Sequence, residues 1–106
     1  MSGRVRLDPR AAEELDHAAD WYERQRAGLG PELLVEVRVA VRTLAERPRA
    51  GSPVDGVDPA LEVRRVRVRR FPYQVVYVMH DEDVVVIAVA HDRRRPDYWA
   101  ARVEST

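Results

Sequence analysis

The 106-residue sequence contains no cysteine and no lysine. Without cysteine it can form no disulfide framework, thiolate nucleophile or cysteine-based zinc site, which is compatible with a reducing compartment. No apolar run approaches the roughly 18 residues that suggest a membrane-spanning helix. The N-terminal stretch MSGRVRLDPR also lacks the apolar core of a signal peptide. These absences predict a cytoplasmic protein with no membrane association.

Several catalytic signatures are missing as well. The sequence has no Ser-His-Asp order, no GxSxG motif, no phosphate loop and no dinucleotide fingerprint. The three histidines, His17, His80 and His91, are not spaced as paired metal ligands. The sequence therefore predicts neither a cofactor nor a metal site.

The charges balance overall but are unevenly distributed. All 18 basic residues are arginines and they match 18 acidic residues. From Val63 to His80 there are five arginines and no acidic residue. A GC-rich genome alone would favour arginine over lysine, but it does not explain this clustering. The C-terminal half is therefore predicted to present an electropositive face, suited to nucleic acid or to an acidic protein segment.

The first half of the chain predicts a short strand and two helices. The length fits a single domain over residues 1–106, and GRVRL alternates as a strand does. Two apolar stripes of equal length then predict helices near residues 9–27 and 31–46. Asp8 is placed to cap the first helix, and Pro31 to begin the second. A short Gly-Pro connection makes them an antiparallel hairpin.

Three strand-like runs follow: LEVRRVRV, YQVVYVM and DVVVIAVA. Short turns between them predict an antiparallel meander, and RPDYWAARV predicts a short terminal helix with Pro96 near its first turn. The predicted fold class is α+β, with an N-terminal strand, a two-helix hairpin packed on an antiparallel sheet, and a short C-terminal helix.

In the last two runs, apolar residues occupy both the odd and the even positions, as in strands that are covered on both faces. Because the helical hairpin covers only one face, valines such as Val76, Val85 and Val89 predict a partner that covers the remainder. A helix or strand of a partner protein that carries acidic residues would fit such a surface.

Arginines occupy every second position in part of the first run. Arg65, Arg67 and Arg69 alternate with Val66 and Val68, so the arginines are expected to face solvent. Side chains two residues apart on a strand are roughly 7 Å apart, close to the spacing of successive phosphates, and arginine binds phosphate or carboxylate at two points. The alternative is a solvated edge strand whose charge prevents aggregation.

The stretch AHDRRRPDYW places an imidazole, three arginines and two aromatic rings at the end of the third run. His91 is suited to act as an acid or base near neutral pH, or to hydrogen-bond the end of a strand. Tyr98 and Trp99 either stack on a base or dock the terminal helix, and docking is the favoured interpretation.

The order of elements and the stretch VRRVRVRRFPYQVVYVMHDEDVVVIAVAHDRRRPDYW resemble the RelE/ParE family of bacterial toxins from type II toxin–antitoxin modules. RLDPRAAEELDHAADWY is similar to the opening strand and first helix of that family. RRFPYQVVYV and VVIAVAHDRRRPDYW are most similar to its ParE-like, or plasmid-stabilisation, branch. The resemblance implies a growth-arresting toxin that a cognate antitoxin neutralises, and that reaches operator DNA only through this antitoxin.

The family divides by target. RelE-like members cleave mRNA on the ribosome without a metal, whereas ParE-like members poison DNA gyrase. The nuclease alternative implies proton transfer by His91 or Tyr98. The residues expected to bind the target or its phosphates are Arg65, Arg67, Arg69, Arg93 and Arg94. Lysine is common in the nuclease branch, so its absence here favours the gyrase target. A third possibility is an inactive scaffold that only binds the antitoxin.

Overall fold

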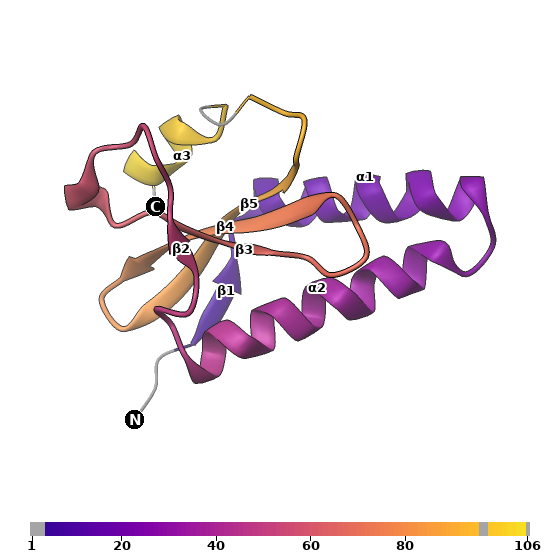
Figure 1. The fold of residues 1–106 in the computed structure, drawn as a ribbon, viewed down its shortest axis with the longest axis horizontal. Coiled ribbons are helices and arrows are strands. Elements are labelled where there is room, and N and C mark those ends of the chain that lie inside the picture. Colours follow the sequence, from indigo (N-terminus) through magenta and orange to yellow (C-terminus); the bar gives the residue numbers. More distant parts are fainter. Residues whose placement is uncertain (1–3, 96–97, 106) are drawn as a thin grey trace.

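The computed structural model describes residues 4–95 and 98–105, so Pro96 lies outside the described residues (Figure 1). It confirms the predicted α+β class. The elements are β1 (Val5–Leu7), α1 (Pro9–Gln25), α2 (Leu29–Glu46), β2 (Ser52–Pro53), the 3-10 helix η1 (Pro59–Leu61), β3 (Arg64–Arg67), β4 (Tyr73–His80), β5 (Asp83–His91) and α3 (Ala100–Glu104). None of the described helices is long and apolar enough to cross a membrane.

The five strands form one sheet in the order β1-β5-β4-β3-β2. Strands β3, β4 and β5 make the predicted antiparallel meander. The N-terminal strand joins it in parallel, with Val5 opposite Val84 and Leu7 opposite Val86. The sheet is therefore mixed. In the chain, the α1–α2 hairpin lies between β1 and the other four strands (Figure 1).

Asp8 is the N-cap of α1, as predicted. Its carboxylate accepts a hydrogen bond from the Arg10 backbone N–H at 2.8 Å, and the Arg10 guanidinium contacts it at 2.8 Å. The side-chain hydrogen bond from Arg10 outweighs the opposing effect of burial and lowers the pKa of Asp8 from its ordinary value of 3.8 to about 2. The cap is thus a charged one, and its strength depends on pH.

The stability of the cap should be lost in acid. Because the pKa of Asp8 is lower in the folded protein, its stabilisation is complete above about pH 4 and disappears as the pH falls through about 2. We expect the wild type to lose about 1–2 kcal/mol more of its unfolding free energy over this window than Asp8→Asn does. Urea unfolding at several pH values measures this difference. Equal pH dependence in the two proteins would show that Asp8 is not the titrating group.

The connection between α1 and α2 is closed by a side chain from α1. Gly28 adopts a left-handed conformation, with φ of 96°, and provides no side chain to cap α2. The Glu23 carboxylate caps it instead, accepting from the backbone N–H groups of Gly28 and Gly30 at 3.0 Å. The second helix therefore starts at Leu29, two residues before the predicted start near Pro31.

Gly30 also lies at a close approach of the two helices. A Cβ at this position would lie 2.7 Å from the carbonyl oxygen of Ala19. We expect Gly30→Ala to lower the free energy of unfolding by about 1–3 kcal/mol, the usual cost of overpacking. Helix propensity alone would raise it by roughly 0.5–1 kcal/mol, so the sign of the change in a urea titration decides between the two effects.

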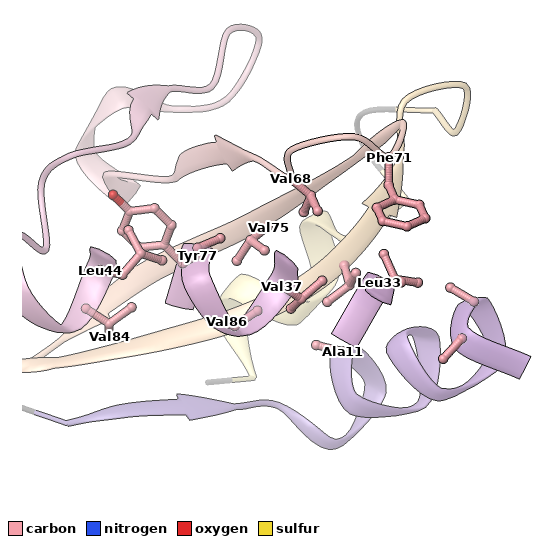
Figure 2. Packing of buried hydrophobic residues seen from close by; sticks show 14 residues of the cluster. Ala11, Leu33, Val37, Leu44, Val68, Phe71, Val75, Tyr77, Val84 and Val86 are labelled. Atoms are coloured by element: carbon pink, nitrogen blue, oxygen red, sulfur yellow. The ribbon is translucent and has the colours of Figure 1, made fainter. Parts of the chain in front are cut away.

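One hydrophobic cluster fills the space between the helices and the sheet (Figure 2). Side chains of α2 lie against alternate residues of the two central strands. The largest contributors are Leu33, Val37 and Leu44 of α2, with Val75 and Tyr77 of β4 and Val84 and Val86 of β5. This cluster fixes the face of the sheet that the helical hairpin covers.

A second cluster covers the opposite face of the sheet. Val76 and Val85 are buried there under Trp99 and Val103 of the C-terminal segment and under apolar residues of the 54–63 loop. The prediction that these valines need a partner to cover them is therefore wrong. Val89 belongs to the helix-side cluster. Trp99, which is 2% exposed, docks the terminal segment as predicted.

Candidate functional site

The arginines predicted from β3 face solvent at one end of the sheet. Arg65 and Arg67 are exposed, and they alternate with Val66 and Val68, which pack on the helix side. Arg67 forms an ion pair with Asp92 at 2.8 Å, in the turn after β5. The β3–β4 turn and the turn after β5 are further joined by a hydrogen bond from the Asp92 backbone N–H to the Pro72 carbonyl, at 2.8 Å.

We call this surface the arginine rim, made of Arg65, Arg67, Arg69 and Arg93, all of which are exposed. It unites two segments that are about 25 residues apart in sequence, counted between Arg67 and Asp92. The rim can present several guanidinium groups to an anion at once.

His91 lies on the other face of the sheet. It pairs with Tyr73, and the two rings meet edge to face with their centroids 5.1 Å apart. A bulge causes this placement, because Val76 pairs with Ala88 while Tyr77 pairs with Val86, which leaves an extra residue in β5. After the bulge, alternation is shifted by one residue, and His91 points toward α1.

The His91 imidazole already has a structural partner. Its Nδ1 accepts a hydrogen bond from the Arg93 backbone N–H at 3.0 Å, and the His91 carbonyl accepts from the Arg94 N–H at 3.0 Å. In the neutral ring this assigns the proton to Nε2. His91 therefore shapes the turn at the end of β5, which is the structural alternative that the sequence left open.

Tyr98 is held through both its hydroxyl and its ring. The hydroxyl donates to Glu14 Oε2 at 2.8 Å, and the Arg94 guanidinium lies 4.0 Å from the ring centroid. Burial, followed by the hydrogen bond to Glu14, raises the pKa of Tyr98 well above its ordinary value. The hydroxyl therefore keeps its proton near neutral pH, so it is poorly suited to act as a general base.

Glu14 was not predicted, yet it organises this side of the molecule. Its carboxylate accepts from the Val89 backbone N–H at 3.0 Å, from Tyr98 and from Arg102 Nη1 at 3.0 Å. The same Arg102 nitrogen donates to the Ile87 carbonyl at 2.9 Å. We call Glu14, Tyr98 and Arg102 the Glu14 clasp, because they tie α1, β5 and the C-terminal segment together.

A shallow pocket of about 290 Å³ lies beside the clasp, between α1 and β5. Its lining includes the predicted His91, Arg94 and Tyr98, together with Trp21 and Tyr73, which were not predicted. Trp21 is 51% exposed. In the sequence, a tryptophan on the polar face of the first helix is the signal that would have pointed to Trp21 as a residue of this pocket.

The predicted site residues thus form two groups rather than one. His91, Arg94 and Tyr98 line the pocket beside α1, whereas Arg65 and Arg67 lie on the sheet face opposite His91. Across residues 4–95 and 98–105 there is no group of three His, Asp or Glu side chains that could hold a metal ion.

Residues 5–96 match the family profile described as the ParE toxin of the type II toxin–antitoxin system. The chain belongs to the ParE toxin family. It is the toxin component of a type II module, and a cognate antitoxin is its partner. No curated protein sequence matches the chain.

Two solved structures share the ParE fold seen here. The first is titled as the chromosomal ParDE system from P. aeruginosa; it is 16% identical, with a TM-score of 0.71, and the match covers 86% of this chain and 96% of that one. The second is an E. coli RelE toxin mutant in the free state, 20% identical with a TM-score of 0.61, covering 99% and 93%.

Proposed function

We propose that this ParE toxin arrests growth by inhibiting DNA gyrase, and that it does so through binding contacts rather than by cleaving RNA. Metal-independent RNA cleavage needs a proton-transfer group and cationic stabilisation at the same phosphate. Of the arginines expected to bind a phosphate, Arg94 alone lines the pocket with His91 and Tyr98. Arg65 and Arg67 lie on the sheet face opposite His91, and this separation supports the proposal most strongly.

The hydrogen bonds of His91 and Tyr98 also support the proposal. His91 Nδ1 accepts a backbone N–H, and the Tyr98 hydroxyl donates to Glu14. The Tyr98 hydroxyl is thus engaged within the molecule, and His91 lies on the sheet face opposite Arg65 and Arg67. The rim itself is exposed and positively charged, as expected of a surface that contacts a large partner.

Controlled expression in a bacterium, with and without the antitoxin, tests the proposal. We expect plasmid supercoiling to fall, or cleaved chromosomal DNA to accumulate, before the rate of translation declines. Antitoxin co-expression should prevent both effects. Intact supercoiling together with cleaved ribosome-bound mRNA would assign the RelE-like activity instead, and normal growth would indicate an inactive antitoxin-binding scaffold.

A further inference from the structure

We propose that the arginine rim binds the phosphodiester backbone of duplex DNA, and that Asp92 is a built-in competitor that weakens this binding. The choice of DNA rests on the proposed function, because gyrase acts on DNA. The binding surface itself follows from the positions of the arginines and of Asp92.

The geometry fits a chain of phosphates. Arg65 and Arg67 stand on the same face of β3, two residues and so roughly 7 Å apart, close to the spacing of successive phosphates along one strand. The Asp92–Pro72 hydrogen bond places the turn that carries Arg93 beside the β3–β4 turn. The rim therefore continues past the end of the strand.

The distribution of charge orients the molecule toward a polyanion. Asp81, Glu82 and Asp83 lie at the other end of the β4–β5 hairpin, beside His80. The eight residues of β4 separate the two ends by roughly 23 Å, at about 3.3 Å per residue. The overall charge is zero, so attraction to DNA depends on this separation of charge and not on the net charge.

The composition of the rim favours phosphate over a protein partner. Protein interfaces usually combine arginine with large apolar or aromatic anchors at their centre. Among the described residues, the large apolar side chains that are exposed belong to α1, α2 and η1: Trp21, Val35, Val39 and Leu61. Phe71, at the tip of the β3–β4 turn, is buried. A surface of guanidinium groups without such an anchor matches backbone contacts to a nucleic acid.

Asp92 occupies the position that a phosphate would take on Arg67. The two side chains are 2.8 Å apart, and Arg67 remains 68% exposed. The Asp92 side chain is 28% exposed. Because the guanidinium side of the pair is open to water, the pair is weak and a phosphate oxygen can displace the carboxylate. The displaced Asp92 then repels the DNA, which lowers the affinity of the rim without removing it.

Binding of the full-length toxin alone to a fluorescent duplex of about 20 base pairs tests this inference by anisotropy. With three phosphate contacts, affinity should fall on the order of 40-fold between 50 and 200 mM salt. Asp92→Asn should tighten binding roughly three- to tenfold. Arg67→Ala should weaken it and reduce the salt slope by about 1.

Asp81→Asn is the matched control, because it removes the same charge at the far end of the hairpin, and it should leave the affinity unchanged. The inference is overturned if the duplex does not bind at 50 mM salt, or if Asp92→Asn binds no better than wild type or the control. Tighter binding to a single-stranded RNA of equal length, or to polyglutamate, would also contradict it.

The anisotropy assay contains no gyrase, so its result is independent of whether the toxin inhibits gyrase. Gyrase inhibition by a toxin that does not bind the duplex would overturn this inference alone. Duplex binding by a toxin that leaves gyrase untouched would overturn the proposed function alone.

Discussion

Glu14→Ala should lower the free energy of unfolding by about 3 kcal/mol, the cost of removing one partner of a largely buried ion pair. The Glu14 and Arg102 side chains are only 20% and 15% exposed. The substitution leaves the buried Val89 N–H and the Tyr98 hydroxyl without their acceptor. The terminal segment should loosen with it, because the Glu14 clasp joins that segment to α1.

Glu13→Ala is the matched control, since Glu13 is the neighbouring acidic residue on α1 and is exposed. It should change stability by less than about 0.5 kcal/mol. Urea unfolding followed by circular dichroism gives the free energies, and tryptophan fluorescence reports whether Trp99 becomes hydrated. If Glu14→Ala and Glu13→Ala unfold at the same urea concentration, the clasp does not hold the terminal segment.

Single arginine substitutions on the rim should weaken toxicity by graded amounts, about 5- to 150-fold each, as expected for charge-assisted contacts of 1–3 kcal/mol. Arg65→Ala, Arg67→Ala and Arg69→Ala are the variants to compare. His91→Ala should change toxicity little, because in the proposed binding mechanism its ring supports a turn and no residue transfers a proton. Inducer titration in growing cells, with matched protein levels, measures the series.

Tyr98 requires a more conservative change than alanine. Because its ring is partly buried and Arg94 packs on it, Tyr98→Ala would disturb the terminal segment itself. Tyr98→Phe keeps the ring and removes only the hydroxyl. A loss of toxicity of a hundredfold or more in folded His91→Ala or Tyr98→Phe would indicate proton-transfer catalysis and contradict the binding mechanism.

The sequence predicted the fold well wherever a local pattern specifies an element. The two apolar stripes predicted both helices to within two residues at each boundary, and the alternation of Arg65 and Arg67 with valines predicted the exposed face of β3. The prediction of a partner over the second sheet face failed for a long-range reason. Its cover comes from Trp99 and from the irregular 54–63 loop, and no periodicity connects these segments to the sheet.

The candidate site was harder to predict, because its contacts join distant residues. Glu14 lies 75 residues from Val89 and 88 from Arg102. The one local signal was an acidic residue on an apolar helix stripe, three residues after Ala11 and four before Ala18. The bulge that turns His91 away from Arg65 could not be predicted either, because the run DVVVIAVA has apolar residues at both odd and even positions and so shows no shift in alternation.

Purified toxin added to DNA gyrase tests the proposed function most directly. We expect inhibited supercoiling of relaxed plasmid, or accumulated cleaved plasmid, and relief of either effect when the cognate antitoxin is added first. His91→Ala should act as the wild type does in the same assay. Unchanged gyrase activity at toxin concentrations that cause cleavage of ribosome-bound mRNA would contradict the gyrase target.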